Sequence, residues 1–297
     1  MKRPTEPPQA SQGQRWGLVV AVGLAALVVA AGLWTWRQAA DDGLGKASDQ
    51  AGAYVGGDLH TLTVVDGRLF VGGHDGVATS TDGGKRWEQV ASLRGADAMG
   101  WAVTPAAILV GGHSGLFRST VGSLSFGKAD GLGEVSDVHA LGAAGNSVYL
   151  ASPQAGLLAS SDGGVSWTLR NSSVGQGFMG TILVDPTDPN RVVAPDMQNG
   201  VVTSTDGGRS WTVLGGPGGT MSLDWDPTRL ERMVAVGMGG GAVTTDGGRT
   251  WADLQLPQGT SAVTFSADGT TLYAAALDGQ TARVAASTDG GTTWKAV

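Results

Sequence analysis

The sequence contains no cysteine among its 297 residues, and this absence removes two kinds of chemistry. No disulfide can form, and no thiolate can hold a metal ion. Basic residues are in the minority, with 19 lysines and arginines against 26 aspartates and glutamates, which argues against a nucleic-acid partner. Tyrosine and histidine are scarce, with three and four copies. The lack of oxidisable thiols fits a protein outside the cytoplasm.

Glycine, by contrast, is abundant, with 50 copies, and many of these lie in a phrase of eight residues that recurs along the chain. The five near-complete copies are S-T-D-G-G-K-R-W at 80–87, S-S-D-G-G-V-S-W at 160–167, S-T-D-G-G-R-S-W at 204–211, T-T-D-G-G-R-T-W at 244–251 and S-T-D-G-G-T-T-W at 287–294. A decayed copy at 119–126 has lost the aspartate and ends in Phe126. A repeat this regular predicts stacked copies of one supersecondary unit.

Each copy lies between two short runs that favour β-strands, so the Asp-Gly-Gly centre predicts a tight hairpin turn. The aspartate side chain can accept hydrogen bonds from the backbone amides of the turn, and the tryptophan ring can pack over the hairpin. The phrase resembles the Asp-box, or BNR repeat, S/T-x-D-x-G-x-x-W, of sialidase-like and sortilin-like β-propellers. The resemblance implies a structural role on the outer rim for ten residues. These are Asp82, Trp87, Asp162, Trp167, Asp206, Trp211, Asp246, Trp251, Asp289 and Trp294.

Alignment on the repeats gives six units of about 40 residues, each with four β-rich runs. The units begin near Asp58, Asp97, Asp137, Gly177, Gly219 and Gly259. Six four-stranded units predict an all-β, six-bladed β-propeller over residues 57–297. The last unit ends at the C-terminus without a spare strand, which leaves open whether residues 50–56 add an edge strand that closes the ring.

The front of the chain has 21 residues without a charge, 16–36, between Arg15 and Arg37. This length crosses a bilayer as a helix, and tryptophans lie at both ends. We therefore expect a transmembrane helix at 16–36, in preference to a cleaved signal peptide. The positive-inside rule places residues 1–15 in the cytoplasm and the propeller outside. Residues 37–56 are expected to be a flexible linker.

The histidines and methionines follow the repeat. Nine of the ten beyond Met1 fall in two registers, and only Met233 falls elsewhere. At the start of the first strand of successive units the register reads His60, Met99, His139, Met179 and Met221. At the end of the second strand it reads His74, His113, Gln154, Met197 and Met238. Because these two positions are adjacent in an antiparallel pair, we expect both registers at one mouth of the central channel.

Imidazoles and thioethers without thiolates suit copper, particularly Cu(I), better than the oxygen-seeking Mg²⁺ or Ca²⁺. The sequence therefore predicts a copper site at this mouth, with His60, His74, His113, His139 and Met99 as its core. Asp58, Asp97 and Asp137 would orient the imidazoles, as would Asp75 and Asp196 beside the second register. The alternative is packing: methionine fills irregular gaps, and duplication copies residues together with their registers.

Two further classes of function stay open. Sialidases and some other glycoside hydrolases share the Asp-box, but the Arg-Ile-Pro motif of sialidases is absent here. The tyrosines are Tyr54, Tyr149 and Tyr273, and the carboxylate pairs to weigh are Asp224 with Asp226 and Asp185 with Asp188. The third class is a scaffold that binds a protein partner, as in sortilin-type receptors and a photosystem II assembly factor, which share only the repeat. A copper protein of this kind could also deliver its metal to a cuproprotein.

Overall fold

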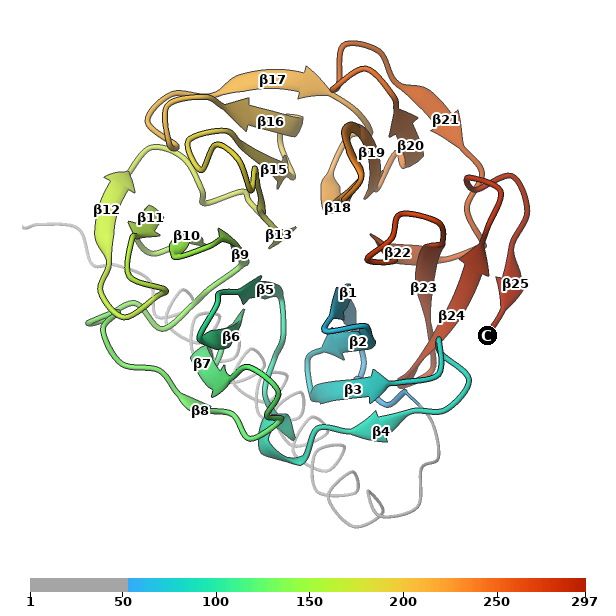
Figure 1. Ribbon diagram of the computed structural model, residues 1–297, viewed down its shortest axis with the longest axis horizontal. Helices are drawn as coiled ribbons and strands as arrows, with labels where there is room; N and C mark the ends of the chain where they lie inside the picture. The colour runs from blue at the N-terminus through green and yellow to red at the C-terminus, as the bar shows by residue number, and fades with distance from the viewer. Residues whose placement is uncertain (1–52) are drawn as a thin grey trace, which may run out of the picture. The chain divides into compact units, whose positions relative to one another are not determined.

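The computed structural model describes residues 53–297, and these form a ring of six β-sheets, the blades (Figure 1). The predicted all-β, six-bladed propeller is confirmed. Across 53–297 the structure contains no helix long and apolar enough to cross a bilayer. The expected transmembrane helix at 16–36, the cytoplasmic segment 1–15 and nearly all of the linker lie outside the described residues.

Each blade is built from consecutive strands. Blade 1 contains β1 (Leu59–Val65), β2 (Arg68–Gly73), β3 (Gly76–Ser80) and β4 (Glu88–Gln89), followed by a 3₁₀ turn (Ala91–Leu93). Blade 2 contains β5 (Gly100–Val103), β6 (Ala107–Gly112), β7 (Gly115–Thr120) and β8 (Gly127–Lys128). Blade 3 contains β9 (Ala140–Ala144), β10 (Ser147–Ser152), β11 (Gly156–Ser160) and β12 (Thr168–Asn171).

The second half of the ring has the same plan with one variation. Blade 4 contains β14 (Leu183–Val184), β15 (Val192–Asp196), β16 (Gly200–Ser204) and β17 (Thr212–Gly215). Blade 5 contains β18 (Thr220–Asp226), β19 (Arg229–Gly237), β20 (Gly240–Thr244) and β21 (Ala252–Leu254). Blade 6 contains β22 (Thr260–Phe265), β23 (Leu272–Asp278), β24 (Thr281–Ser287) and β25 (Lys295–Ala296). The variation is β13 (Gly180–Thr181), which precedes blade 4 in the chain and pairs in parallel with β9, so that the sheet of blade 3 has five strands.

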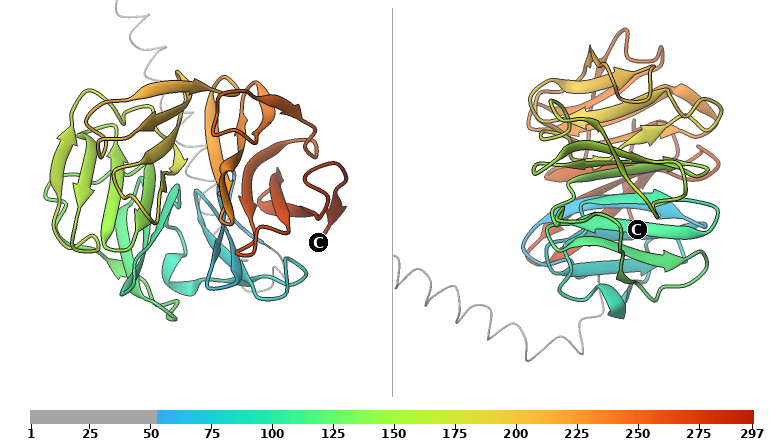
Figure 2. Two further views of the ribbon diagram at one scale, coloured as in Figure 1. Left: turned by 45° about the horizontal axis from the view of Figure 1, so that its top comes forward. Right: turned by 90° about the vertical axis from the view of Figure 1, so that its left-hand side faces the viewer.

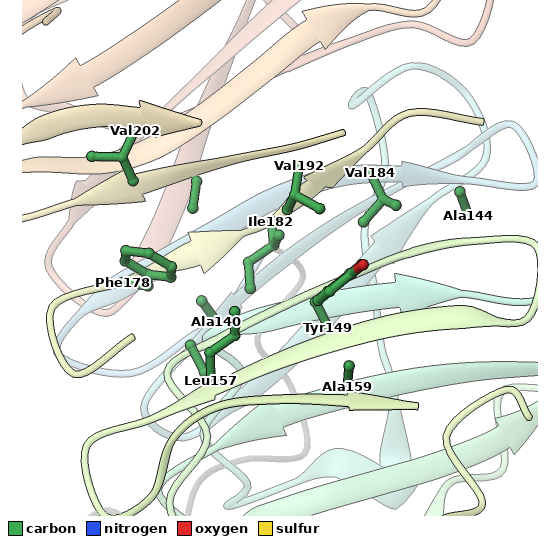
Figure 3. Close-up of a cluster of buried hydrophobic side chains, with 12 residues drawn as sticks. Ala140, Ala144, Tyr149, Leu157, Ala159, Phe178, Ile182, Val184, Val192 and Val202 are labelled. Carbon is green, nitrogen blue, oxygen red and sulfur yellow. The ribbon is translucent and has the colours of Figure 1, made fainter. Parts of the chain in front are cut away.

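The hydrophobic core lies between the blades. Six buried clusters fill the six junctions of the ring, and the one between blades 3 and 4 is shown in Figure 3, where Leu157 and Phe178 meet Ile182 and Val192. Middle strands are therefore covered on both faces, and β6 is buried at all six of its residues. This explains why the middle strands read as continuous apolar runs rather than as alternating patterns.

The repeated phrase forms the turn between the third and fourth strands of a blade. In the first copy the Ser80 hydroxyl donates to Asp82 Oδ1 (3.0 Å) and accepts the Gly84 amide (2.9 Å), while Asp82 Oδ1 accepts the Arg86 amide (2.9 Å). These hydrogen bonds, with that of the Arg86 side chain foremost, lower the pKa of Asp82 to about 2. The aspartate is thus held as a turn acceptor, as the sequence predicts.

The large aromatic residue that ends each copy packs into the junction with the preceding blade. Trp87, Trp167, Trp211, Trp251 and Trp294 each contact the cluster on that side. Phe126, which ends the decayed copy, is buried in the junction between blades 1 and 2 and so occupies the equivalent place. The repeat therefore specifies the contact between neighbouring blades as well as the turn.

Residues 53–56 close the ring. Tyr54 pairs with Thr281 of β24, the Ala282 amide donates to the Ala53 carbonyl (2.8 Å), and Val55 is fully buried in the junction between blades 6 and 1. These residues thus add an edge pairing to blade 6, the alternative that the sequence leaves open. The last residues of the expected linker, from Ala53 onward, thus pack against the propeller.

The backbones of three blades approach one another near the axis. A Cβ built on Gly100 of blade 2 would lie 2.9 Å from the carbonyl oxygen of Gly180 in β13, which pairs with blade 3, and one built on Gly180 would lie 2.7 Å from the Met221 carbonyl oxygen of blade 5. Gly180 also has a φ of 68°, a conformation that favours glycine. A side chain at either glycine would collide with these backbone atoms, so the close approach requires glycine.

Candidate metal centre

The four histidines lie at the same face of the ring. His60 is the second residue of β1 and His74 directly follows β2, its antiparallel neighbour, while His113 directly follows β6 and His139 directly precedes β9. In the side view of Figure 2 the strands run from one face of the ring to the other. The repeated turns follow the opposite ends of the third strands and therefore lie at the other face.

The imidazole rings form an unbroken row across blades 1, 2 and 3. The ring centroids are 4.7 Å apart for His60 and His74, 5.7 Å for His74 and His113, and 5.1 Å for His113 and His139. We call these four residues the histidine row. All histidines of the sequence belong to it. Residues up to 79 positions apart in the chain are thus adjacent, because they occupy equivalent positions in consecutive blades.

Three aspartates accompany the histidine row. Asp97 Oδ1 lies 3.4 Å from His60 Nε2, while Asp97 Oδ2 contacts His113 Nδ1 and accepts the His113 amide (3.2 Å). Asp58 Oδ2 lies 4.0 Å from His60 Nε2, and Asp137 Oδ1 lies 3.1 Å from His139 Nε2. The Asp97 side chain is only 6% exposed, so its carboxyl group is shielded from water between blades 1 and 2.

These seven residues form three overlapping groups that could each hold a metal ion. In each group the possible ligand atoms all lie within 4.8 Å of one another. The groups are Asp58 with His60 and His74, His74 with Asp97 and His113, and His113 with Asp137 and His139. The sequence predicts the aspartates as residues that orient the imidazoles, whereas the structure places their oxygens at the distances of potential ligands.

Four buried polar atoms of this cluster face one another in pairs without hydrogen-bond geometry: His60 Nε2 lies 3.4 Å from Asp97 Oδ1, and His139 Nε2 lies 3.1 Å from Asp137 Oδ1. Within residues 53–297 six buried side-chain atoms lack a partner, and four of them are His60 Nε2, Asp97 Oδ1, Asp137 Oδ1 and His139 Nε2. Buried polar groups are normally satisfied, so an unsatisfied group calls for a physical reason. A cation bound to both atoms of each pair would provide one, since it satisfies an imidazole and a carboxylate together.

Burial also affects the protonation of the two end imidazoles, those of His60 and His139. Desolvation lowers the pKa of His60, and this outweighs the opposite effect of the nearby Asp97 and Asp58 carboxylates. Desolvation likewise lowers the pKa of His139, against the effect of Asp137. Both imidazoles are therefore neutral at pH 7. The neutral imidazole, with a free lone pair, is the form that binds a metal ion.

Two glycines at the ends of second strands make room for this arrangement. A Cβ on Gly73 would lie 2.0 Å from the Asp58 carbonyl oxygen, and a Cβ on Gly112 would lie 2.2 Å from the Asp97 carbonyl oxygen. Each glycine directly precedes a histidine of the row. The close approach of the backbone thus brings the aspartate that precedes the first strand beside the histidine that follows the second strand.

The methionines of the two registers do not share one environment. Met99 is 2% exposed, Met179 and Met221 are partly buried, and Met197 and Met238 are exposed, with Met238 at 77%. None of these five belongs to the six clusters between the blades of the described ring, whereas Met233, the methionine outside both registers, is fully buried in the junction of blades 4 and 5. The register methionines therefore lie outside the six clusters that fill the blade junctions.

Backbone contacts join one methionine position to the row. The amide of Gly180, the residue after Met179, donates to the His139 carbonyl (2.9 Å) through the β9–β13 pairing.

Two predicted orienting residues are placed elsewhere. The Asp196 carboxylate accepts the amides of Gln198 (2.7 Å) and Asn199 (3.2 Å) and so forms a turn, and Asp75 lies against the hydroxyl of Tyr54.

The carboxylates weighed for glycoside hydrolysis have structural partners. Asp226 pairs with Arg232 (3.2 Å) and Asp185 pairs with Arg191 (3.0 Å). Asp224 accepts the Phe265 amide (2.8 Å) from the next blade. Tyr149 donates its hydroxyl to the Pro189 carbonyl (2.9 Å). These side chains hold turns and blade junctions in place.

No protein-family model and no curated protein matches the sequence. Solved structures do. The chain is 17% identical to a GH74 xyloglucanase from Xanthomonas campestris, with a TM-score of 0.57. The aligned region covers 84% of this chain and 46% of the xyloglucanase. The chain is also 17% identical to YCF48 bound to a D1 peptide, with a TM-score of 0.53 and coverage of 83% and 82%. A chain of a nidogen/laminin complex is 12% identical, with a TM-score of 0.57 and coverage of 74% and 88%. This chain thus spans about half the length of the xyloglucanase, and the likeness establishes the β-propeller fold.

Proposed function

We propose that this protein binds copper at the histidine row and its three aspartates. The observation that carries the proposal is the pairing of buried, unsatisfied atoms, His60 Nε2 with Asp97 Oδ1 and His139 Nε2 with Asp137 Oδ1, inside groups of potential ligands. Burying a carboxylate without a counter-charge destabilises the folded state by about several kcal/mol, and a bound cation offsets this loss.

The donor atoms favour a divalent ion. Imidazole nitrogens and carboxylate oxygens suit Cu²⁺, Zn²⁺ and Ni²⁺, and the Irving–Williams order places Cu²⁺ first among divalent ions at such a site. The thioethers expected to favour Cu⁺ do not share one environment, since Met238 is 77% exposed and Met99 is 2% exposed. They therefore carry less weight than the imidazoles and carboxylates in the choice of ion. The proposal is therefore a Cu²⁺ site made of nitrogen and oxygen ligands.

The test is retention of metal by the full-length protein, purified in a non-ionic detergent and stripped with a chelator. Cu²⁺, Cu⁺, Zn²⁺ and Ni²⁺ would be added separately, free metal removed, and bound metal counted by elemental analysis. We expect Cu²⁺ to be retained and to be lost in the double variant His60→Ala/His139→Ala. Gln154→Ala, at the corresponding second-strand position of blade 3, is the matched control and should bind as the wild type does. A wild-type protein that retains no metal would overturn the proposal.

The cellular setting is part of the same proposal. Residues 16–36 would anchor the chain in a membrane, with 1–15 in the cytoplasm and the propeller, whose repeated turns we take to be Asp-boxes, on the other side. A copper binder held in this way would handle copper outside the cytoplasm or deliver it to a cuproprotein. Protease treatment of intact cells tests the orientation, since an external propeller is digested while the cytoplasm is protected.

A protein partner at the same face is a second candidate, favoured by the exposure of Met197 and Met238 at 38% and 77%. Both follow second strands, as His74 and His113 do. Flexible thioethers adapt well to varied partner surfaces. The two functions separate experimentally: partner capture by a scaffold would fail on Met197→Glu/Met238→Glu and be insensitive to His60→Ala, whereas metal retention would show the reverse.

A further inference from the structure

We infer that the histidine row holds two metal ions, one at each end, and that Asp97 links them. This inference rests on the proposed function and concerns how many ions the site takes. The buried unsatisfied atoms fall into two separate pairs, and these pairs lie at opposite ends of the row. A single central ion would leave both pairs unsatisfied.

The first site consists of Asp58, His60 and His74, completed by Asp97 Oδ1. His60 Nε2 is 4.0 Å from Asp58 Oδ2 and 3.4 Å from Asp97 Oδ1, so both oxygens approach the same nitrogen. Two ligands that are each about 2 Å from one ion are separated by roughly 3–4 Å. An ion bound among these atoms needs only small side-chain movements.

The second site consists of His113, Asp137 and His139. His139 Nε2 is 3.1 Å from Asp137 Oδ1, and the rings of His113 and His139 are 5.1 Å apart. The Nδ1 of His113 is already engaged by Asp97 Oδ2. His113 would therefore bind through Nε2, in the arrangement in which a carboxylate holds the other nitrogen of a metal-binding imidazole.

Asp97 thus serves both ions with its two oxygens. Oδ1 would bind the first ion, and Oδ2 holds a ligand of the second. This division uses each imidazole once, whereas the central group of His74, Asp97 and His113 would compete with both end groups for a histidine. Three carboxylates would offset three of the four positive charges of two divalent ions.

The experiment counts Cu²⁺ in the full-length protein by elemental analysis after free metal is removed, and records the EPR spectrum of the loaded protein. We expect about two ions per chain, and a spectrum broadened by the coupling of two nearby Cu²⁺ ions. His60→Ala should keep one ion, in the second site, and His139→Ala should keep one, in the first. Each of these variants should give the sharp spectrum of an isolated ion.

Asp97→Asn adds a test of the link. The variant loses a charged ligand of the first ion, so we expect about one ion to remain, bound at the His113 and His139 end. If the wild type retains one uncoupled ion, and that ion survives in both His60→Ala and His139→Ala, the two-ion inference is wrong while the copper proposal stands. If the wild type retains none, both fail.

Discussion

Asp97 Oδ1 lies 3.4 Å from His60 Nε2, although the two residues belong to different blades. The aspartate precedes the first strand of blade 2, and the histidine lies in the first strand of blade 1. Its other oxygen contacts His113 within its own blade. One buried carboxylate therefore holds the imidazoles of two blades in register, which makes the site a property of the assembled ring.

Metal binding should stabilise the folded protein. A ligand that binds only the native state adds about 2.7 kcal/mol to the free energy of unfolding when its concentration is 100 times its Kd. For a domain of this size that corresponds to a rise in Tm of roughly 5–10 °C. Thermal denaturation followed by circular dichroism, with and without Cu²⁺, measures the shift. A shift of equal size in His60→Ala/His139→Ala would show that copper binds elsewhere.

Gly112→Ala should disturb the site through the backbone. The new Cβ would lie 2.2 Å from the Asp97 carbonyl oxygen, so the strand start carrying Asp97 must move. Overpacking of this kind costs about 1–3 kcal/mol, and displacement of Asp97 should also weaken copper retention. Gly127→Ala is the control, because a Cβ at Gly127 meets no atom within 4 Å. Chemical denaturation and metal counting on both variants decide the matter; equal effects would contradict the prediction.

Asp224 should give the protein a stability that depends on pH. Desolvation raises the pKa of Asp224 to about 6 from 3.8, in spite of its hydrogen bonds to Phe265 and Thr264. The folded state therefore holds this proton more tightly than the unfolded state. The contribution of Asp224 to stability is full below pH 3.8 and is lost as the pH rises through about 6. The change amounts to roughly 2–3 kcal/mol.

The measurement is the free energy of unfolding between pH 4 and 7 for the wild type and Asp224→Asn. The lowered pKa values of His60 and His139 act in the opposite direction over the same range, so the wild-type profile alone is not diagnostic. The difference between the two proteins isolates Asp224. It should change with pH so that the wild type gains relative to the variant as the pH falls. A difference that is flat across this range would disprove the assignment.

The tryptophans of the repeated turns offer a matched pair. The Trp251 indole donates to the Leu214 carbonyl of the preceding blade (3.0 Å), whereas the Trp167 indole nitrogen is buried without an acceptor. Trp251→Phe loses a hydrogen bond and leaves a carbonyl unpaired, so it should cost about 1 kcal/mol more than Trp167→Phe. Urea denaturation of the two variants gives the comparison. The opposite order would show that ring packing outweighs the hydrogen bond.

Much of the fold follows from local sequence signals. The five copies of the repeated phrase determine their own turns, because Ser80, Asp82 and Gly84 satisfy one another within five residues. The positions of His60 and His74 at one end of an antiparallel pair follow from the same periodicity. Ring closure through Tyr54 and Thr281 has no such signal, since the pairing joins segments 227 residues apart and depends on blade 6 being in place.

The sequence by itself determined the number of blades, their turns and the face of the ring that carries the histidines, because these depend on contacts repeated at a fixed spacing along the chain. Only the tertiary structure decided that the four imidazoles form one row, that Met99 is buried while Met238 is exposed, and that Asp97 reaches both His60 and His113. These relations depend on how closely one blade packs against the next, a distance set by buried side chains and glycines throughout the ring.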